Sequence, residues 1–321
     1  MLKVLGDVHA GRRFVNDVPL HRRGEREVEV LEQLRKSLDV GPEVEAHVQT
    51  GDLFDSFKVD NETVLEVADI YMEAAARYPG CDFYVYPGNH DLAKDESKKS
   101  SFQVFDAIVA GTSNIHVTWV PTSFKVGATP YAIMPWHPFK SALELANEVH
   151  LLLQVPEDQK FEAVFTHCDT TDYGGPNVLP TQALATIAKS IINGHVHKPS
   201  TFTRDGIKVI NQGSMQPYAH GEEETPTRYL TLTPEEFEAH KDLHDKYIRV
   251  KVPKGAIPPE TPDCLGFKIL FAEEGKEEAP DVQVEFEEFN TRSLFAQCLK
   301  ECSVSQETTT KVLEKFDVPQ T

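Results

Sequence analysis

Five short motifs in this sequence carry side chains that can bind metal ions. They are rich in aspartate, asparagine and histidine, and most of them begin with a glycine. In chain order the motifs are Gly6-Asp7-Val8-His9, Gly51-Asp52-Leu53-Phe54-Asp55, Gly88-Asn89-His90-Asp91, Thr166-His167 and Gly194-His195-Val196-His197. Carboxylate, amide oxygen and imidazole together suit Mn²⁺, Fe²⁺ or Zn²⁺ and are poor ligands for a metal that prefers thiolates. The set therefore indicates a metal centre.

Hydrolysis of a phosphate ester is the chemistry that such a centre performs well. The reaction needs a nucleophile at neutral pH and stabilisation of the charge on the phosphoryl oxygens, and two metal ions about 3.5–4 Å apart supply both. One carboxylate must then bridge the ions, and a proton donor must meet the leaving oxygen. A single motif of this kind is often an ordinary turn, but five in one order predict one site.

The motifs lie where strands are expected to end. Short apolar runs predict strands at Leu2–Leu5, His47–Thr50, Phe83–Tyr86, Ile115–Val120, Tyr131–Pro135, Ala163–Thr166, Ser190–Ile192, Phe202–Thr203, Lys208–Ile210 and Tyr229–Leu232. This pattern is typical of an α/β fold, in which ligands gather outside the carboxyl ends of the strands. A glycine there lets the backbone turn sharply, so that the next side chain projects into the cleft.

Helices are expected between these strands, at Glu25–Leu38, Asn61–Tyr78 and Ser141–Leu153. The apolar spacing predicts the buried face of each of the first two. For the first helix the predicted face is Val28, Leu31, Leu34 and Leu38, and for the second it is Val64, Val67, Ala68 and Tyr71.

The chain divides into three parts. Residues 1–238 contain all five motifs and form the expected catalytic domain. Residues 239–290 are predicted to form a small acidic α+β appendage with strands at Tyr247–Val252 and Phe267–Phe271, and residues 291–321 a helical tail. Two short apolar faces lie in this tail, within Ser293–Leu299 and Thr310–Phe316.

The formal charge of −19 argues against nucleic acid as a partner, because a polyanion is usually met by a basic face. The charge is unevenly distributed, however. Residues 221–321 hold 22 Asp and Glu against 12 Lys and Arg, whereas basic residues cluster at Arg12-Arg13, Arg22-Arg23 and Lys98-Lys99. These clusters follow closely behind the first and third motifs, and they suggest a locally basic surface beside the site.

Residues near the N-terminus run directly into a strand pattern, without the features of a signal peptide. No stretch reaches the roughly 18 apolar residues expected of a membrane helix, so no membrane partner is expected. The cysteines are odd in number and scattered, at Cys81, Cys168, Cys264, Cys298 and Cys302. They indicate reduced thiols in a cytoplasm rather than a disulfide framework.

The ordered set Asp-x-His, Gly-Asp, Gly-Asn-His-Asp, His and Gly-His-x-His resembles the calcineurin-like metallophosphoesterases over roughly Met1 to Leu232. The resemblance implies a β-sandwich flanked by helices. It also implies two divalent metal ions, Mn²⁺ above all, with Mg²⁺, Fe²⁺ and Zn²⁺ as alternatives.

The same resemblance implies a role for each side chain. The first metal would be held by Asp7, His9 and His197, and the second by Asn89, His167 and His195. Asp52 would bridge the two ions. His90 would act as general acid or would stabilise the transition state, and Asp55 would orient His90 through a hydrogen bond. Asp91 would shape the turn.

Within that superfamily the chain resembles the SbcD-type DNA nucleases, relatives of the Mre–Rad repair nuclease. Three segments carry this finer resemblance: residues 51–56, the Pro-rich strand end at residues 134–139, and the Gly-Ser segment at residues 211–218 followed by Glu222. Protein phosphatases of the fold have Asp-Arg-Gly where this chain has Asp55-Ser56-Phe57, so their phosphate-gripping arginine is missing. Eukaryotic and archaeal nucleases carry His at the position of Asp55.

This branch implies partners: DNA, a second copy of the nuclease in a homodimer, and an SbcC-type ATPase that binds a C-terminal helical segment. Residues 239–290 would correspond to a capping region, and residues 291–321 to the ATPase-binding segment. The activity would be exonuclease, single-strand endonuclease or both, in DNA repair and recombination.

Two other functions remain open from the sequence. The first keeps the fold and changes the substrate, as in a phosphatase or a cyclic-nucleotide phosphodiesterase, and the charge of −19 favours it slightly. The second is a non-catalytic scaffold for a partner ATPase. The intact ligand set argues against a scaffold, because no expected ligand position is substituted.

Overall fold

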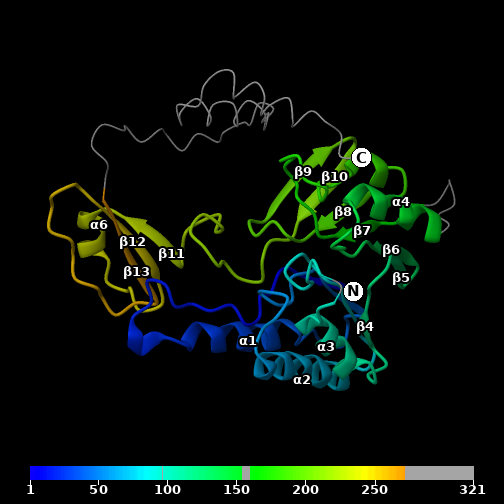
Figure 1. Cartoon of the computed structure of the whole chain (residues 1–321), viewed down its shortest axis with the longest axis horizontal. Helices are drawn as coiled ribbons and strands as arrows, with labels where there is room; N and C mark the ends of the chain where they lie inside the picture. Colours follow the sequence, from blue (N-terminus) through cyan, green and yellow to red (C-terminus); the bar gives the residue numbers. More distant parts are fainter. Residues whose placement is uncertain (96, 154–159, 272–321) are drawn as a thin grey trace.

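Two β-sheets packed face to face form the main body of the protein (Figure 1). The computed structural model describes residues 1–95, 97–153 and 160–271. The first sheet is parallel throughout, in the order β1-β2-β3-β4. Its strands are β1 (Leu2–Leu5), β2 (Ala46–Gln49), β3 (Asp82–Val85) and β4 (Ile115–Val117).

The second sheet has six strands in the order β5-β6-β7-β8-β10-β9. They are β5 (Thr122–Val126), β6 (Thr129–Ile133), β7 (Ala163–Thr166), β8 (Ser190–Asn193), β9 (Ser200–Arg204) and β10 (Ile207–Asn211). The four inner strands are parallel, and each edge strand pairs antiparallel with its neighbour. Strands β7 and β8 are apolar on both faces, as expected of strands covered on both sides.

A core of aliphatic and aromatic side chains fills the space between the two sheets. Val48 comes from the first sheet, and Phe124, Ile133 and Phe165 come from the second. The ring of Phe124 stacks on that of Tyr84 at a centroid distance of 4.3 Å, so the contact crosses from one sheet to the other. Burial of this surface holds the sheets face to face.

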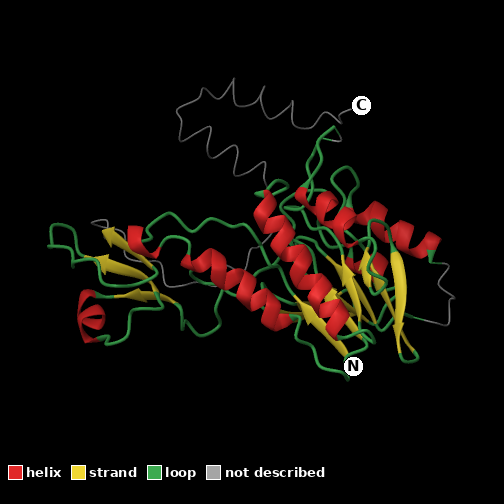
Figure 2. Cartoon of the chain, turned by 90° about the horizontal axis from the view of Figure 1, so that it is seen from below, coloured by secondary structure: helices red, strands yellow, loops and turns green. Residues whose placement is uncertain are grey.

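Helices cover the outer side of each sheet (Figures 1 and 2). The first sheet is covered by α1 (Glu25–Ser37), α2 (Asn61–Arg77) and α3 (Ser101–Val109), and the second by α4 (Ala142–Leu152) and α5 (Thr181–Leu184). The predicted fold class, a helix-flanked β-sandwich of α/β type, is confirmed. Within the described ranges, no helix is long and apolar enough to cross a membrane.

A third, smaller sheet lies beside the N-terminal end of α1 (Figure 1). Its strands β11 (Tyr229–Leu232), β12 (Tyr247–Val252) and β13 (Gly266–Phe271) are parallel, and α6 (Pro234–Ala239) connects the first two. A short 3-10 turn, η1 (Leu20–Arg22), precedes α1. The predicted division at residue 238 therefore falls inside this unit, which begins at β11. The predicted tail, 291–321, and the end of the acidic region lie outside the described residues.

The buried face of α1 differs from the predicted one. Val28 is 58% exposed, whereas Arg26 is almost fully buried. Arg26 donates hydrogen bonds to the side chain of Gln216 (2.7 Å) and to the carbonyl oxygen of Pro217 (2.9 Å). Arg26 also pairs with the carboxylate of Glu29 at 2.9 Å. These contacts offset the cost of burying the charge, so an arginine lies on the buried face of this helix. The predicted face of α2 is buried as expected.

Candidate metal centre

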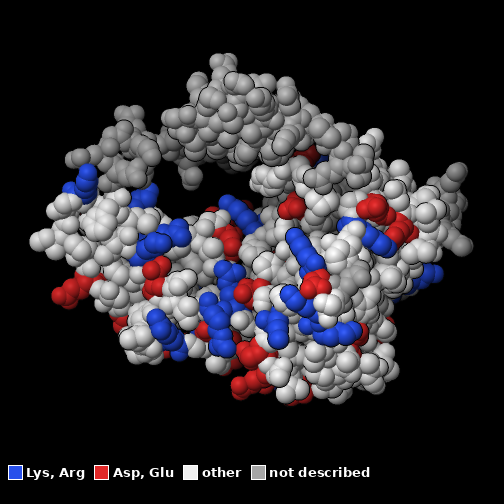
Figure 3. All heavy atoms as spheres, in the orientation of Figure 1, with Lys and Arg blue, Asp and Glu red and all other residues white. Residues whose placement is uncertain are grey.

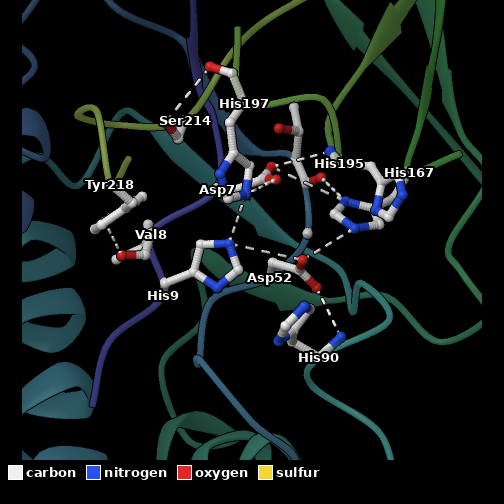
Figure 4. A network of polar contacts seen from close by, with 12 residues as sticks. Asp7, Val8, His9, Asp52, His90, His167, His195, His197, Ser214 and Tyr218 are labelled. Atoms are coloured by element: carbon white, nitrogen blue, oxygen red, sulfur yellow. Dashed lines mark hydrogen bonds and ion pairs between the residues drawn. The ribbon is translucent and has the colours of Figure 1, made fainter. Parts of the chain in front are cut away.

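The five motifs meet at one edge of the sandwich, where the carboxyl ends of strands from both sheets lie together (Figure 4). Asp7 and His9 follow β1, Asp52 follows β2, and Asn89 and His90 follow β3, all in the first sheet. His167 follows β7, and His195 and His197 follow β8, in the second sheet. All of the site residues predicted from sequence are therefore brought to one place.

One group of potential ligands consists of Asp7, His9 and His197. The Nε2 atoms of the two histidines lie 2.9 Å apart, and His197 Nε2 lies 3.6 Å from Asp7 Oδ2. Asp7 is fully buried, and its Oδ2 has no hydrogen-bond partner among the described residues. A buried carboxylate oxygen without a donor is costly unless a cation neutralises it.

A second group lies next to the first and contains Asn89, His167 and His195. Asn89 Oδ1 is 3.0 Å from His167 Nε2 and 2.8 Å from His195 Nδ1. The carboxylate of Asp52 faces both groups, because its Oδ2 lies 3.3 Å from His167 Nε2 and 3.9 Å from His9 Nε2. Asp52 is thus placed where a bridging ligand is required.

The backbone is strained at three of these positions. His9, Asp52 and His195 have φ angles of 49°, 51° and 69°, in the left-handed region that side chains other than glycine rarely adopt. Such strain costs of order 1–3 kcal/mol per residue and clusters at functional sites. Gly88 is required for a different reason, since a Cβ atom there would lie only 2.2 Å from Asp52 Oδ1.

The outer ring nitrogens of three histidines contact oxygen acceptors. His167 Nδ1 donates to the Thr50 carbonyl oxygen at 2.8 Å. His195 Nε2 lies 2.7 Å from Asp169 Oδ1, and His197 Nδ1 lies 3.0 Å from Glu222 Oε1. These contacts orient the three rings so that their inner nitrogens face the ligand groups.

Of these two carboxylates, only Glu222 belongs to a segment that the sequence singled out. Asp169 was missed, although it stands two residues after the predicted ligand His167. An acid so close to a predicted ligand histidine is a signal that could have been used.

Burial and neighbouring charges set the protonation of these groups. Burial lowers the pKa of His9 to about 3, so this ring is neutral and able to bind metal. Burial disfavours a charge on His167, but the carboxylates of Asp52 and Asp7 raise its pKa to about 10. Burial likewise opposes ionisation of Asp52, yet His167 holds the pKa of that carboxyl well below its usual range. A metal ion that binds His167 must therefore displace a proton.

His90 lies at the rim of the site, and its ring is exposed. Its backbone N–H donates to Asp52 Oδ1 at 2.9 Å, and its Nδ1 donates at 2.6 Å to the main-chain carbonyl oxygen of Asp55. The hydrogen bond to Asp55 thus involves the backbone of that residue. The carboxylate of Asp55 lies with Oδ1 3.5 Å from His9 Nδ1 and 3.7 Å from Arg12. Together with His9 and His90 it forms a third group of potential ligands at the rim.

Asp91 is fully buried and accepts three backbone hydrogen bonds, from Leu53, Phe54 and Gly88. It ties the loop after β2 to the loop after β3, as its predicted role in the turn requires. The positions of Asp52 and His90 depend on these two loops.

The residues fit a pair of divalent cations. Two groups of nitrogen and oxygen atoms converge, an orphaned carboxylate oxygen lies in one of them, and a shared carboxylate lies between them. The donor set suits borderline metals such as Mn²⁺, Fe²⁺ and Zn²⁺ and includes no thiolate. Cys168, next to His167, is buried, and burial raises its pKa to about 12, so it stays a thiol.

The two outer carboxylates give a prediction about metal affinity. Replacing Glu222 with Gln, or Asp169 with Asn, should weaken metal binding by about 10–100-fold, because the histidine behind each loses its oriented partner. Titration calorimetry with Mn²⁺ measures the change. Glu223, next in the chain, accepts backbone hydrogen bonds from residues 227–229 and does not contact the site, so Glu223→Gln is the control. Equal affinities in all three variants would contradict the role of these carboxylates.

A fold of this kind with paired metal-ligand groups at its strand ends defines a metal-dependent phosphoesterase. The chain belongs to the calcineurin-like phosphoesterase family, whose model matches residues 2–199. No curated protein matches the sequence.

Solved structures that match this chain include a phosphopantetheinyl hydrolase from Mycobacterium tuberculosis, at 14% identity and a TM-score of 0.42, and the match covers 68% of this chain and 93% of that one. The protein TT1561 of Thermus thermophilus shares 12% identity at a TM-score of 0.44, covering 67% and 89%. A putative 5′-nucleotidase from Staphylococcus aureus, in complex with alpha-ketoglutarate, shares 14% identity at a TM-score of 0.40. That match covers 67% of this chain and 48% of the nucleotidase chain. Likenesses this distant say nothing about the substrate of this chain.

Proposed function

We propose that this phosphoesterase is a nuclease that hydrolyses the phosphodiester bonds of DNA with two divalent metal ions, Mn²⁺ in the first place. The observation that carries the proposal is the position of Asp52, whose carboxylate faces both ligand groups and also accepts a hydrogen bond from the backbone of His90. Ligands, bridge and proton donor are thereby held within one small site. When bound, the pair of ions supplies an activated water and neutralises phosphoryl charge.

His90 is suited to protonate the leaving sugar oxygen. Its Nδ1 is engaged as a donor to the Asp55 carbonyl oxygen, so the proton that it can give away is the one on Nε2. The catalytic form of His90 is then the imidazolium ion, which donates from both nitrogens. Since the ring is exposed at the rim, the leaving oxygen of a long polynucleotide can reach it.

The openness of the site supports a large substrate. His90 is exposed, and the side chains of His195 and His197 are 25% and 23% exposed. The chain also lacks the Asp-Arg-Gly arginine of the protein phosphatases, with Ser56 at its position. Arg12 lies beside Asp55 at the same rim and offers a cation to a phosphate.

A release assay tests the proposal. The purified full chain with Mn²⁺ is expected to degrade linear duplex or single-stranded DNA. Hydrolysis of a small aryl phosphate with both DNA substrates left intact, even after an SbcC-type ATPase is added, would contradict it.

The second candidate is a phosphatase or cyclic-nucleotide phosphodiesterase with the same chemistry. The net charge of −19 favours it, because a polyanionic substrate is repelled at long range. The release assay separates the two candidates, since only the phosphatase or cyclic-nucleotide phosphodiesterase is expected to prefer the aryl ester to DNA.

We further propose that the nuclease works as a homodimer with an SbcC-type ATPase, in an SbcCD-like complex for DNA repair or recombination in the cytoplasm. The segment proposed to bind the ATPase, residues 291–321, lies outside the described residues. Deleting Ser293–Thr321 should abolish binding of the ATPase in a pull-down, and retained binding would refute this part of the proposal.

A further inference from the structure

A cavity of about 220 Å³ lies between the main body and the small sheet. One wall is the loop of residues 12–18 that follows the first motif, and another is the segment 218–220 that follows β10. Residues of β11, β12 and β13 form the rest of the lining. The cavity is thus built from three parts of the chain that are far apart in sequence.

The lining is cationic, although the chain as a whole is acidic. Four of its described residues carry a positive charge, and Asp17 is the one acid among them. The cations are Arg12, Arg13, Arg249 and Lys268. Figure 3 shows Lys and Arg side chains, with Asp and Glu side chains between them, on the face between the small sheet and the larger body. In a protein with a net charge of −19, a concentration of cations at one cavity indicates an anionic ligand.

Arg13 pairs with Asp60 at 3.1 Å, but the other three cations are only loosely neutralised by the described residues. Arg12 lies 3.7 Å from Asp55, and Lys268 lies 4.0 Å from Asp17, both at the upper limit for an ion pair. Exposed pairs at such distances contribute little, so a phosphate can replace the carboxylate. Arg249 lines the cavity together with His220, and burial and the charge of this arginine lower the pKa of that histidine to about 4.

The walls are held in place by contacts within the protein. The backbone N–H of Phe267 donates to the carbonyl oxygen of Asp17 at 2.7 Å, which fixes the loop against β13. The rings of Tyr229 and Tyr247 stack at 4.6 Å and are nearly parallel. Only glycine fits at position 266, because a Cβ atom there would lie 2.6 Å from the Tyr247 ring. A cavity with fixed walls binds a ligand at a lower entropic cost.

A single aromatic ring separates this cavity from the metal centre. Tyr218 lines the cavity, and its ring centroid lies 5.4 Å from that of His9 and 5.9 Å from that of His197. Its hydroxyl donates to the carbonyl oxygen of Val8, which fixes the ring in this position. Arg12 lies over the same ring, 5.1 Å from its centroid, and so stands between the two sites. The cavity and the metal centre are therefore adjacent, with Arg12 at their boundary.

We propose that this cavity binds a second phosphate group of the substrate strand, beyond the phosphodiester that is cleaved, through Arg12, Arg249 and Lys268. The inference rests on the proposed nuclease function and specifies its substrate as a polynucleotide. At 220 Å³ the cavity is smaller than the roughly 300–1,000 Å³ of a typical ligand pocket, which suits a phosphate group with its immediate substituents. A mononucleotide or an aryl ester has no second phosphate to place there.

The test compares two substrates in the double variant Arg249→Gln/Lys268→Gln, in the full chain with Mn²⁺. One substrate is a thymidine octamer, and the other is bis(4-nitrophenyl) phosphate, which has a single phosphodiester. The ratio of their kcat/KM values, octamer over aryl diester, should fall at least tenfold relative to the unmodified protein. The dependence of the octamer reaction on salt should weaken as well, since each phosphate contact on a single strand contributes a slope of about 0.7.

Lys125→Gln/Lys208→Gln is the matched control. It removes two exposed lysines on β5 and β10 of the second sheet and should change neither the ratio nor the salt slope. If the octamer is degraded and the Arg249→Gln/Lys268→Gln variant has the kcat/KM ratio and the salt slope of the unmodified protein, the cavity does not bind the strand. If the unmodified protein cleaves the aryl diester and no oligonucleotide, the nuclease function itself fails, and the inference with it.

Discussion

Replacing Asp52 with asparagine is expected to leave the protein folded but unable to retain its metal ions. The variant keeps an oxygen that can accept the hydrogen bond from the His90 backbone, and asparagine tolerates a φ of 51°. It removes the negative charge that faces both ligand groups. Removing a residue that only orients a metal ligand lowers metal affinity by up to about 100-fold. Removal of the Asp52 charge should lower it by more than that. Metal analysis after gel filtration measures the ions retained per chain.

Asp205→Asn is a matched control for this experiment. Asp205 also has a left-handed backbone, with a φ of 50°, and it lies in the turn between β9 and β10, away from the five motifs. The Asp205→Asn variant should keep the metal content and the activity of the unmodified protein. An Asp52→Asn protein with the metal content of the unmodified chain would disprove the bridging role.

Replacing His90 with asparagine is expected to abolish turnover while metal binding is preserved. The side chain of His90 is exposed and contacts a backbone carbonyl oxygen. It converges with His9 and Asp55 in a third group, but it is absent from the two groups assigned to the ions. Loss of a general acid typically costs about 10²–10⁴-fold in rate. The rate of DNA release with Mn²⁺, measured together with metal content, tests both halves of this expectation.

His116 offers the comparison for that variant. It is a partly exposed histidine on β4 that pairs with Asp82 at 2.9 Å, remote in sequence from the motifs. His116→Asn should retain the activity of the unmodified protein. If His90→Asn loses its metal along with its activity, His90 is a ligand; if it keeps its activity, another group protonates the leaving oxygen.

The position of the site could be predicted from the sequence because its signals are local. Each motif joins a short apolar run to a polar residue, usually through a glycine, and the ends of parallel strands meet at one edge of a sheet. This is why Asp7, Asp52 and His167 lie together although more than 100 residues separate the first from the last. The bounds of β1, β7, β11 and β12 were also predicted to the residue.

The remaining features depend on contacts between distant segments. Arg26 is buried on α1 because Gln216 and Pro217, about 190 residues later, accept its hydrogen bonds, and no spacing rule contains that information. The prediction omitted α3, although Ser100 and Gln103 form a capping box at its start. It also omitted β5, whose single buried residue, Phe124, gives a weak alternating pattern. The acceptor of the His90 hydrogen bond is a main-chain atom, which side-chain chemistry cannot indicate.

The ligands of each expected ion come from both sheets of the sandwich. The first group combines Asp7 and His9, after β1, with His197, after β8, and the second combines Asn89, after β3, with His167 and His195. Metal binding and the association of the two sheets at this edge are therefore thermodynamically linked. A free ion concentration of 100 times Kd adds about 2.7 kcal/mol to the free energy of unfolding for one site. Chelation should lower the melting temperature, and the lifetime of the protein in a cell would then follow the supply of metal.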